Sequence, residues 1–351
     1  MPVEKQNIYG QIPEALLPWY AANHRDLPWR KDKDPYHIWV SEIMLQQTRV
    51  EAVKGYYSRF LDALPNIAAL ANADDELLHK LWEGLGYYSR VRNLKKAAIQ
   101  IMERHGGVFP KTHEEVSELA GIGPYTSGAI CSIAFGLPTP AVDGNVLRVI
   151  SRLTDDDTPI DKPAFRKEIT EKLAAVYPPC AGDFTQALME LGATVCGPNR
   201  KPDCANCPCR DFCLGFRNGT AETLPVKKAK PQRRIEDKTV LILSCDGFYA
   251  LSKRPDTGLL AGLWEFPNIP CKMELSQAVS EVEIKGIKIK EILRQVEKKH
   301  IFTHIEWHMN GIYMEVKEQA GDFIWMQEQT IRSEAALPTA FRQFFEEADY
   351  V

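Results

Sequence analysis

The spacing of hydrophobic residues changes once along this chain, and that change limits the folds open to it. From Ile12 to about Leu214, apolar residues recur three or four positions apart, as in Leu77–Leu85, which is typical of amphipathic helices. After Lys238 the spacing becomes that of short strands, for example over 239–243. The sequence therefore predicts two domains of different class, an all-α domain followed by an α+β domain.

The segment between the two patterns is basic and has the composition of a connector. Between Val226 and Arg234 it contains three lysines, two arginines and a proline, with no acidic residue. Such a run suits either a solvated linker or a strap over a phosphate backbone. We predict a helical domain over 1–217, a basic linker over 218–237 and a second domain over 238–351. Further strands are predicted at 248–251, 311–316 and 323–326, and helices near 275–282 and 339–347.

Composition excludes several classes of protein. No apolar run approaches the ~18 residues that a membrane span needs, and the N-terminus lacks the apolar stretch of a secretory signal. Nine cysteines in such a chain are expected to be reduced thiols or metal ligands and not a disulfide framework. We therefore expect a cytoplasmic protein. The net charge of −4 does not by itself suggest a nucleic-acid binder, although an acidic average can conceal a basic patch.

Two glycines mark a tight turn between predicted helices at Leu119–Thr126. Gly121 and Gly123 flank an isoleucine, and glycines so placed let backbone amides approach a phosphate because no side chain intervenes. Asp143 follows at the head of another predicted helix, where its carboxylate could cap that helix or face an electron-poor carbon. On the residues alone, both interpretations stay open.

A second carboxyl stands out by its surroundings. Glu42 lies amid apolar residues in the segment Trp39–Thr48. Desolvation there would raise the pKa of the carboxyl and favour its protonated form near neutrality, which suits a general acid. The alternative is a solvated glutamate on the outer face of a helix.

Four cysteines gather in a loop-rich segment that follows the last predicted helix of the first domain. Cys196, Cys204, Cys207 and Cys213 are separated by seven, two and five residues. Either zinc or a [4Fe–4S] cluster accepts four cysteine ligands, and the spacing alone does not choose between them. Cys209 is a fifth thiol within the same loop.

Taken together, these motifs resemble the helix-hairpin-helix DNA glycosylases, and among them the MutY-type adenine glycosylases. The matching segments of the first domain are Arg25–Arg30, Trp39–Thr48, Leu85–Arg90, Leu119–Thr126 and Val142–Asn145. The segment Gly258–Pro267 resembles that family's recognition domain, which is itself similar to Nudix hydrolases. The resemblance covers the whole chain. It implies an all-α helix-hairpin-helix glycosylase domain with an iron–sulfur loop over 196–213, followed by a Nudix-like α+β domain.

The resemblance assigns roles to the two carboxyls. It implies that Glu42 protonates adenine at N7, that Asp143 stabilises or transiently captures the sugar cation, and that Tyr125 and Asn145 orient the reactants. Departure of a base through an oxocarbenium-like state requires one protonated and one ionised carboxyl. Relatives that also cut the strand carry a lysine where this chain has Tyr125. We therefore predict base removal by water alone, without a Schiff base.

The resemblance also implies residues that handle the duplex. Flipping a base out of the stack leaves a gap that an inserted side chain can fill. The family's adenine pocket maps to Arg25, Leu27, Trp29 and Gln186, its wedge to Gln47 and Tyr87, and its hairpin to Gly121 and Gly123. Trp29 has a plain alternative as a core residue.

In the second domain, the resemblance implies a binding module for 8-oxoguanine. Phe302, Thr303 and His304 match the family's Phe-Ser-His loop, and Thr303 keeps the hydroxyl while adding a methyl group. Without the resemblance, the expectation for His304 is a histidine of the surface or the core with no special role. The region 274–283 lacks the glutamate-rich arrangement with which active Nudix hydrolases bind Mg²⁺. We therefore predict no hydrolase function there, which argues against sanitation of the nucleotide pool.

For the cysteine loop, the resemblance favours a [4Fe–4S] cluster over zinc, held by Cys196, Cys204, Cys207 and Cys213 in a structural role. The first gap between ligands is one residue longer than in that family. Because the extra residue lies in a loop bounded by prolines, we expect the ligands to be preserved.

The predicted function is that of a monofunctional adenine DNA glycosylase of base excision repair. It would act as a monomer on double-stranded DNA that holds adenine opposite 8-oxoguanine or guanine, in a bacterial cytoplasm and associated with the nucleoid. The rival hypothesis is a catalytically silent iron–sulfur protein that only senses mispairs. Retention of both Glu42 and Asp143 argues against that rival.

Overall fold

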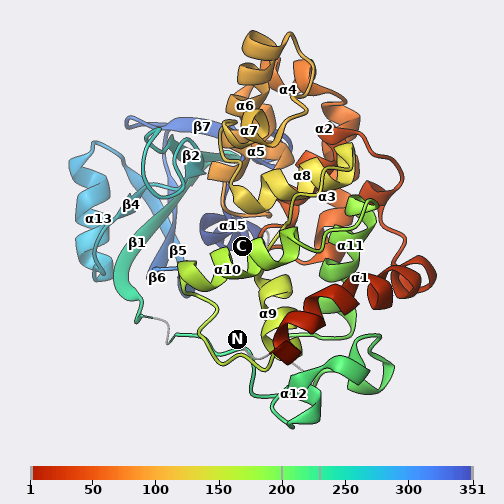
Figure 1. The fold of residues 1–351 in the computed structure, drawn as a ribbon. Helices are drawn as coiled ribbons and strands as arrows, with labels where there is room; N and C mark the ends of the chain where they lie inside the picture. The colour runs from red at the N-terminus through yellow and green to blue at the C-terminus, as the bar shows by residue number, and fades with distance from the viewer. Residues whose placement is uncertain (1–2, 199–200, 229–230, 349–351) are drawn as a thin grey trace. The chain divides into compact units, whose positions relative to one another are not determined.

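The computed structural model of this protein describes residues 3–198, 201–228 and 231–348 (Figure 1). Two residues of the predicted linker, 229 and 230, and two of the cysteine loop, 199 and 200, lie outside the described residues. The chain divides into two compact units, Met1–Asn72 with Arg92–Ala229 and Ala73–Val91 with Lys230–Val351. The second unit therefore includes a segment, 73–91, that the predicted division at residue 217 places in the helical domain.

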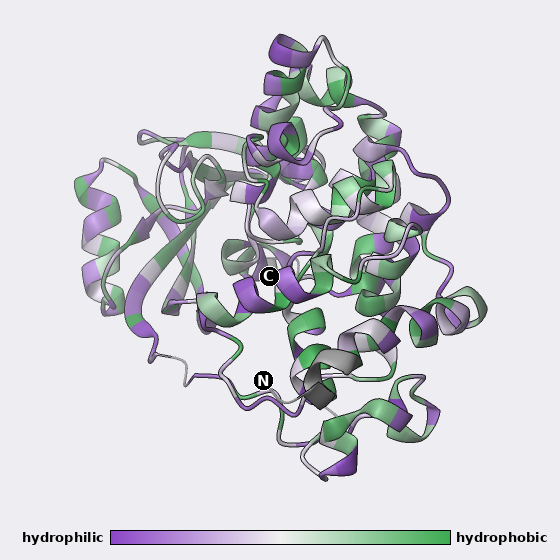
Figure 2. Cartoon of the chain, in the orientation of Figure 1, coloured by the Kyte–Doolittle hydropathy of each residue, from purple (hydrophilic) through white to green (hydrophobic). Residues whose placement is uncertain are grey.

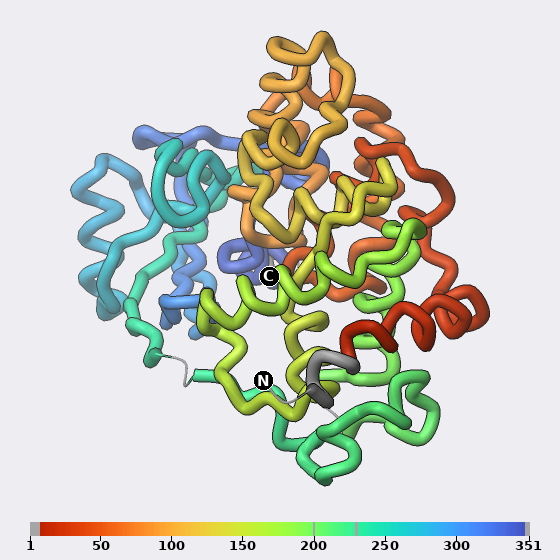
Figure 3. Tube along the Cα trace, viewed as in Figure 1, coloured from red at the N-terminus to blue at the C-terminus, as the bar shows by residue number. Residues whose placement is uncertain are grey.

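The first unit is built from helices, as the spacing of its apolar residues predicts. Its α-helices are α1 Val3–Asn23, α2 Pro35–Leu45, α3 Val50–Ala63, α4 Ile67–Asn72, α6 Ser89–His105 (which begins in the second unit), α7 His113–Ser117, α8 Pro124–Phe135, α9 Gly144–Leu153, α10 Pro163–Ala174, α11 Ala181–Thr194 and α12 Leu214–Arg217. Short 3₁₀ turns are η1 Pro28–Arg30, η2 Cys204–Asn206 and η3 Arg210–Phe212. Figure 3 follows the chain from α11 through the cysteine loop into α12, in green.

One core cluster of this unit joins α1, α9 and α11. Ile12 and Leu16 of α1 pack with Ile150 of α9 and with Phe184 and Leu188 of α11, and all five side chains are buried. Each such side chain stabilises the fold by roughly 1.5–3 kcal/mol when fully buried. This packing fixes α9, whose first turn carries Asp143, against α11.

The predicted hairpin lies between α7 and α8. Gly121 has a φ of +75°, and a Cβ atom added there would come within 2.6 Å of the Cβ atom of Asn93. Both observations require glycine at this position. Gly123 is the N-cap of α8 and Pro124 is its first residue, a common start for a helix.

The second unit contains a mixed sheet and four α-helices within the described residues. The sheet runs in the order β3-β2-β1-β6-β5, with β4 paired to β1 and β7 paired to β2. Its strands are β1 Arg234–Cys245, β2 Phe248–Lys253, β3 Trp264–Glu265, β4 Asn268–Ile269, β5 Ile289–Ile301, β6 Ile305–Val316 and β7 Ile324–Gln327. Its helices are α5 Asp75–Leu81, α13 Leu275–Ile284, α14 Glu328–Ser333 and α15 Thr339–Ala348.

The central strand β1 is buried on both faces, which explains its continuous apolar run. Ile242 belongs to a cluster with Phe341 and Phe344 of α15, whereas Leu243 belongs to one with Val282 of α13. Alternate residues of a strand point to opposite faces, so the two helices cover opposite sides of the sheet. Figure 2 shows β1 beginning hydrophilic and becoming hydrophobic.

Five elements of this unit differ from the sequence predictions: β3, β4, β5 and α14 have no predicted counterpart, and β1 begins earlier than predicted. The strand β1 begins at Arg234, so the last residues of the predicted linker, 234–237, belong to the sheet. The long strand β5 has no predicted counterpart, because it is an edge strand in which charged and apolar residues mix without strict alternation. The other predicted strands and both predicted helices lie at or within one residue of observed elements. None of the described helices is long and apolar enough to cross a membrane.

Candidate active site

A cleft of about 650 Å³ opens in the first unit, among α2, α8, α9, α10, α11 and the segment around η1. It brings together nine of the residues singled out in the sequence: Arg25, Leu27, Trp29, Glu42, Gln47, Tyr125, Asp143, Asn145 and Gln186. These residues are spread over more than 160 positions of the chain, from Arg25 to Gln186. Gly121, Gly123, Tyr87 and the loop 302–304 are not among the residues that line it.

Glu42 lies on α2 with only 6% of its surface exposed. The hydroxyl of Tyr125 donates a hydrogen bond to Glu42 Oε2 at 2.6 Å. Burial raises the pKa of Glu42 to about 7. The hydrogen bond from Tyr125 lowers this pKa, and the charge of Asp143 raises it. Burial also raises the pKa of Tyr125 well above its usual range, so the phenol keeps its proton and remains the donor. Glu42 can therefore hold a proton near neutral pH.

Asp143 has different partners, and they favour its charged form. It is the N-cap of α9, where Oδ1 accepts the backbone N–H of Val146 at 2.7 Å and Oδ2 accepts the Asn145 amide at 2.7 Å. Burial raises the pKa of Asp143, whereas these N–H donors and the nearby Arg148 guanidinium lower it. At Asp143, N–H groups of Val146 and Asn145 and the charge of Arg148 oppose the cost of burial. At Glu42, the Tyr125 hydroxyl and the charge of Arg30 do so. The proton shared by the site therefore belongs on Glu42.

Arg148 fixes the orientation of the Asn145 amide. It donates to Asn145 Oδ1 at 2.8 Å, so the amide nitrogen of Asn145 must face Asp143. The same guanidinium donates to the carbonyl oxygens of Gly192 at 2.7 Å and Cys196 at 2.9 Å. A chain of hydrogen bonds thus runs from Asp143 to the cysteine loop.

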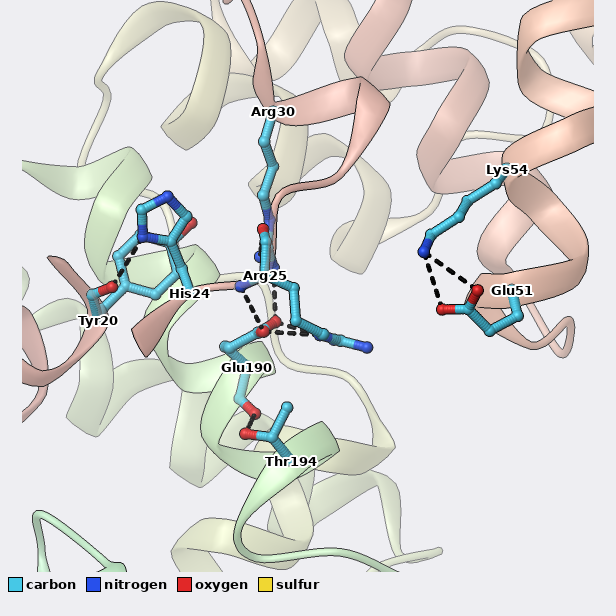
Figure 4. Close-up of polar contacts among 8 residues, drawn as sticks. All are labelled: Tyr20, His24, Arg25, Arg30, Glu51, Lys54, Glu190 and Thr194. Atoms are coloured by element: carbon cyan, nitrogen blue, oxygen red, sulfur yellow. Dashed lines mark hydrogen bonds and ion pairs between the residues drawn. The ribbon is translucent and has the colours of Figure 1, made fainter. Parts of the chain in front are cut away.

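Two arginines of the cleft share one buried carboxylate (Figure 4). Arg25 Nε and Arg30 donate to opposite oxygens of Glu190 at 2.7 and 2.8 Å, and the side chain of Glu190 is fully buried. Burial would raise the pKa of Glu190, but the bonds from Arg25 and Arg30 outweigh it and hold the pKa at about 2. Sequence reasoning missed Glu190 and Arg30. The sequence did offer clues to both residues. Glu190 follows Gln186 by four residues, which places the two on one face of a helix, and Arg30 lies in the same matching segment as Arg25.

The remaining predicted pocket residues supply apolar surface and one amide. Leu27 and Trp29 are buried, and Trp29 packs edge-on against Tyr57 with ring centroids 5.5 Å apart. Trp29 is thus both a core residue and a wall of the cleft, so its two interpretations are not exclusive. Within the part of the chain that the structure describes, Gln186 lines the cleft and its side chain has no hydrogen bond.

Both predicted wedge residues have a left-handed backbone conformation. Gln47 has a φ of +60° and Tyr87 a φ of +48°. Among the described non-glycine residues only Asp155, Asp246 and Leu260 share this feature. Such a conformation is costly for a residue with a Cβ atom, and it concentrates at functional sites. Gln47 lines the cleft of the first unit, whereas Tyr87 belongs to the second unit.

In the second unit, Tyr87 meets the loop 302–304. The hydroxyls of Tyr87 and Thr303 form a hydrogen bond of 3.0 Å. The loop is the turn between β5 and β6, and Phe302 anchors it by packing edge-on against Trp307, with ring centroids 4.7 Å apart. Thr303 and His304 are exposed. The turn therefore presents two polar side chains on a fixed aromatic base.

The four predicted cysteine ligands line one small apolar cavity beside α9 and α11. Cys196, Cys204, Cys207 and Cys213 all contribute to it, whereas Cys209 is fully buried and does not. In the described parts of the chain, no three His, Cys, Asp or Glu side chains converge closely enough to hold a single metal ion. Zinc and a [4Fe–4S] cluster both accept four cysteine ligands, so the residue types around this cavity fit either group.

Two known families match different parts of the chain. Residues 40–175 match the family described as HhH-GPD superfamily base excision DNA repair protein, and residues 239–347 match the NUDIX domain. The fold also resembles a thermostable thymine-DNA glycosylase, at 28% identity and a TM-score of 0.55 over 61% of this chain and 97% of that one. An endonuclease III from a trapped covalent complex with DNA shares the fold at 22% identity and a TM-score of 0.53, over 62% of this chain and 99% of that one.

Several relatives span both domains. The adenine DNA glycosylase of Arabidopsis thaliana is 38% identical over 89% of this chain, which spans 58% of that relative's length. The adenine DNA glycosylase of Mus musculus is 36% identical, with 83% of this chain and 68% of the relative aligned. For that of Buchnera aphidicola (subspecies Baizongia pistaciae) the identity is 34%, with 86% and 85% aligned. This chain has a buried carboxyl pair in a helix-hairpin-helix domain, followed along the sequence by a Nudix-like domain, and it belongs to the adenine DNA glycosylase family.

Proposed function

We propose that this protein is a monofunctional adenine DNA glycosylase that removes adenine mispaired with 8-oxoguanine or guanine. The observation that carries the proposal is the pair Glu42 and Asp143, which share one cleft. Burial outweighs the Tyr125 bond at Glu42 and raises the pKa of that carboxyl to about 7, whereas N–H donors oppose the effect of burial on the pKa of Asp143. Cleavage of an N-glycosidic bond through an oxocarbenium-like state needs that division of labour.

In the proposed reaction the bond between adenine N9 and the sugar C1′ breaks, and its electron pair leaves with the base. Glu42 transfers its proton to adenine N7 and makes the base a better leaving group. Asp143 stabilises the positive charge that develops at C1′. Water adds to C1′ and gives up a proton to the pair of carboxylates, which restores the starting protonation of the site. Tyr125 and Asn145 hold the two carboxyls in place through the hydrogen bonds described above.

The flipped adenine occupies the cleft in this proposal. Leu27 and Trp29 offer apolar contact, and the unengaged amide of Gln186 is available for a base edge. Arg25 is held at the cleft by Glu190 and offers its remaining N–H groups. Gln47 and Tyr87 enter the stack that the adenine has left, and the hairpin amides around Gly121 and Gly123 grip a phosphate.

The composition of the cleft supports a glycosylase without lyase chemistry. A Schiff base with the sugar requires a primary amine. Among the described residues that line the cleft, the cations are arginines, namely Arg25, Arg30 and Arg166, and no lysine contributes. Hydrolysis therefore leaves an abasic site in an uncut strand.

Two further parts of the proposal concern the rest of the chain. Phe302, Thr303 and His304 recognise 8-oxoguanine opposite the adenine, with Thr303 as the hydroxyl group that reads the lesion. Cys196, Cys204, Cys207 and Cys213 hold a [4Fe–4S] cluster, which supplies structure to the segment after α11 and takes no part in catalysis. The protein acts as a monomer on double-stranded DNA.

The test is single-turnover excision on duplexes that differ at one pair: adenine opposite 8-oxoguanine, guanine or thymine, and thymine opposite guanine. We expect the fastest adenine release opposite 8-oxoguanine, strand cleavage only after alkali, and no borohydride-trapped complex. The Glu42→Gln variant should bind the mispair and fail to excise. Tight mispair binding by the wild type without adenine release would favour the sensor protein instead.

A further inference from the structure

The backbone that carries Tyr87 adopts a conformation that needs outside support. Gly84, Gly86 and Tyr87 all have positive φ values, of +98°, +69° and +48°. The two glycines adopt such angles at little cost, but Tyr87 does not. Its side chain is nevertheless 47% exposed, so burial of the ring cannot by itself repay the strain. Other contacts must hold this turn.

Arg90 supplies those contacts from the first turn of α6. One of its terminal nitrogens donates to the carbonyl oxygens of Leu85 at 2.9 Å and Gly86 at 3.0 Å, so it binds both peptide groups that lead into Tyr87. Its backbone N–H donates to the carbonyl of Tyr87 at 2.9 Å. Trp82 adds a bond from its indole N–H to the Gly86 carbonyl at 3.1 Å. The turn is thus bound on both sides of Tyr87.

The same guanidinium also supports the aromatic ring. It lies 5.2 Å from the ring centre of Trp82 and 5.7 Å from that of Tyr87. Arg90 is only 8% exposed, and burial lowers its pKa to about 10, so it remains charged at neutral pH. A buried cation between two rings is attracted to both. The terminal nitrogen that donates to the turn meets two of its carbonyl oxygens.

We propose that Arg90 is a positioning residue that clamps Tyr87 in its left-handed, exposed conformation, ready to enter a base stack. This inference rests on the proposed function, in which Tyr87 acts as a wedge. An arginine beside a DNA-contacting residue would ordinarily be assigned to a phosphate. The burial of Arg90 and its two carbonyl partners assign it to the backbone of the turn instead.

The experiment compares Arg90→Met with Lys96→Met, which removes the same charge from an exposed side chain of the same helix. The probe is a duplex with 2′-fluoro-2′-deoxyadenosine, which resists excision, opposite 8-oxoguanine. We expect Arg90→Met to weaken binding about tenfold, as loss of a buried cation–π contact and its hydrogen bonds implies. The slope of log Kd against log salt should be unchanged. A phosphate contact would lower that slope by about 0.9, and such a fall would overturn the proposal.

A double-mutant cycle separates positioning from general destabilisation. In a Tyr87→Ala background, Arg90→Met should cause little further loss of affinity, because the ring that it positions is absent. Additive losses would overturn the proposal. Arg90→Lys, which keeps the charge but not the planar fork, should bind with intermediate affinity and covers the case in which Arg90→Met fails to fold.

The outcomes also separate this inference from the proposed function. Wild-type protein that does not bind the mispair contradicts the function and the inference together. Wild-type binding and excision, with Arg90→Met binding equally well, contradict only the inference.

Discussion

At the scale of single residues, the chemistry depends on which donors meet each carboxyl. Glu42 and Asp143 are both buried, yet one accepts a hydroxyl and the other accepts two N–H groups. The sequence predicted the raised pKa of Glu42 from its apolar neighbours, and the structure confirms it. It could not predict that Arg25 and Arg30 converge on Glu190, because that ion pair joins residues 160 or more positions apart.

In the proposed reaction, the pH dependence of excision follows from the protonation of Glu42. Because the acid must be protonated and its pKa is about 7, single-turnover excision should be level at lower pH and fall above about pH 7, by ~tenfold per unit. Tyr125→Phe removes the hydrogen bond that lowers this pKa, so the alkaline fall should move to higher pH. Rates measured from pH 5.5 to 9 on both proteins check this. A fall that moves to lower pH in the variant would contradict the assignment.

The stability of the wild-type protein should also fall as this carboxyl loses its proton. A carboxyl whose pKa rises from 4.5 to about 7 on folding costs nothing below the lower value and its full penalty above the upper one, up to about 3 kcal/mol. Glu42→Gln removes that penalty. The variant should therefore gain thermal stability over the wild type as pH rises from 4.5 to about 7, and the difference should stay level above that. A stability difference that does not change with pH would refute a buried charge at Glu42.

At the scale of elements, the local spacing of apolar residues predicted the helices and strands whose burial is periodic, and it failed for those whose burial is not. The helices of the first unit and the strand β1 were predictable, because burial selects apolar residues at regular positions. The edge strand β5 was not, since its exposed charges resemble a loop. No pattern of residues predicts the left-handed conformations of Gln47 and Tyr87 either, because tertiary contacts impose them.

The hairpin offers a matched pair of glycine substitutions. Gly121→Ala meets both a positive φ and the Asn93 side chain, so it should destabilise the protein by more than ~1 kcal/mol and weaken binding to DNA. Gly123→Ala has an ordinary φ of −99° and open space around its Cβ position, so it should be nearly neutral for stability. Thermal melting and duplex affinity check both variants. Equal effects of the two substitutions would contradict this account of the turn.

At the scale of the whole molecule, sequence order and compact units do not coincide. Residues 73–91 lie within the span of the helical domain, yet they belong to the second unit. Lys80 donates to the carbonyl oxygens of Ile331 and Ala335, and Glu83 accepts the N–H of Leu337 at 3.0 Å. Partners some 250 positions away leave no trace in local spacing, so this grouping was beyond sequence-based prediction.

Glu76 provides a test of that grouping. Its carboxylate binds Lys253 and accepts the indole N–H of Trp264 at 3.0 Å. Glu76→Gln should loosen the segment 73–91 by about 1 kcal/mol and speed hydrogen exchange of its amides ~fivefold. The amides of α8 in the first unit serve as the internal control and should exchange as in the wild type. Unchanged exchange over 73–91 would show that this contact does not hold the segment.

The hydrogen bond between Tyr87 and Thr303 has a consequence for timing. Under the proposed function, Tyr87 separates the bases and Thr303 contacts the base opposite the adenine. A hydrogen bond joins these two side chains before either contacts DNA. Opening and inspection then become one event, with no interval in which an undamaged pair stays open while its identity is checked.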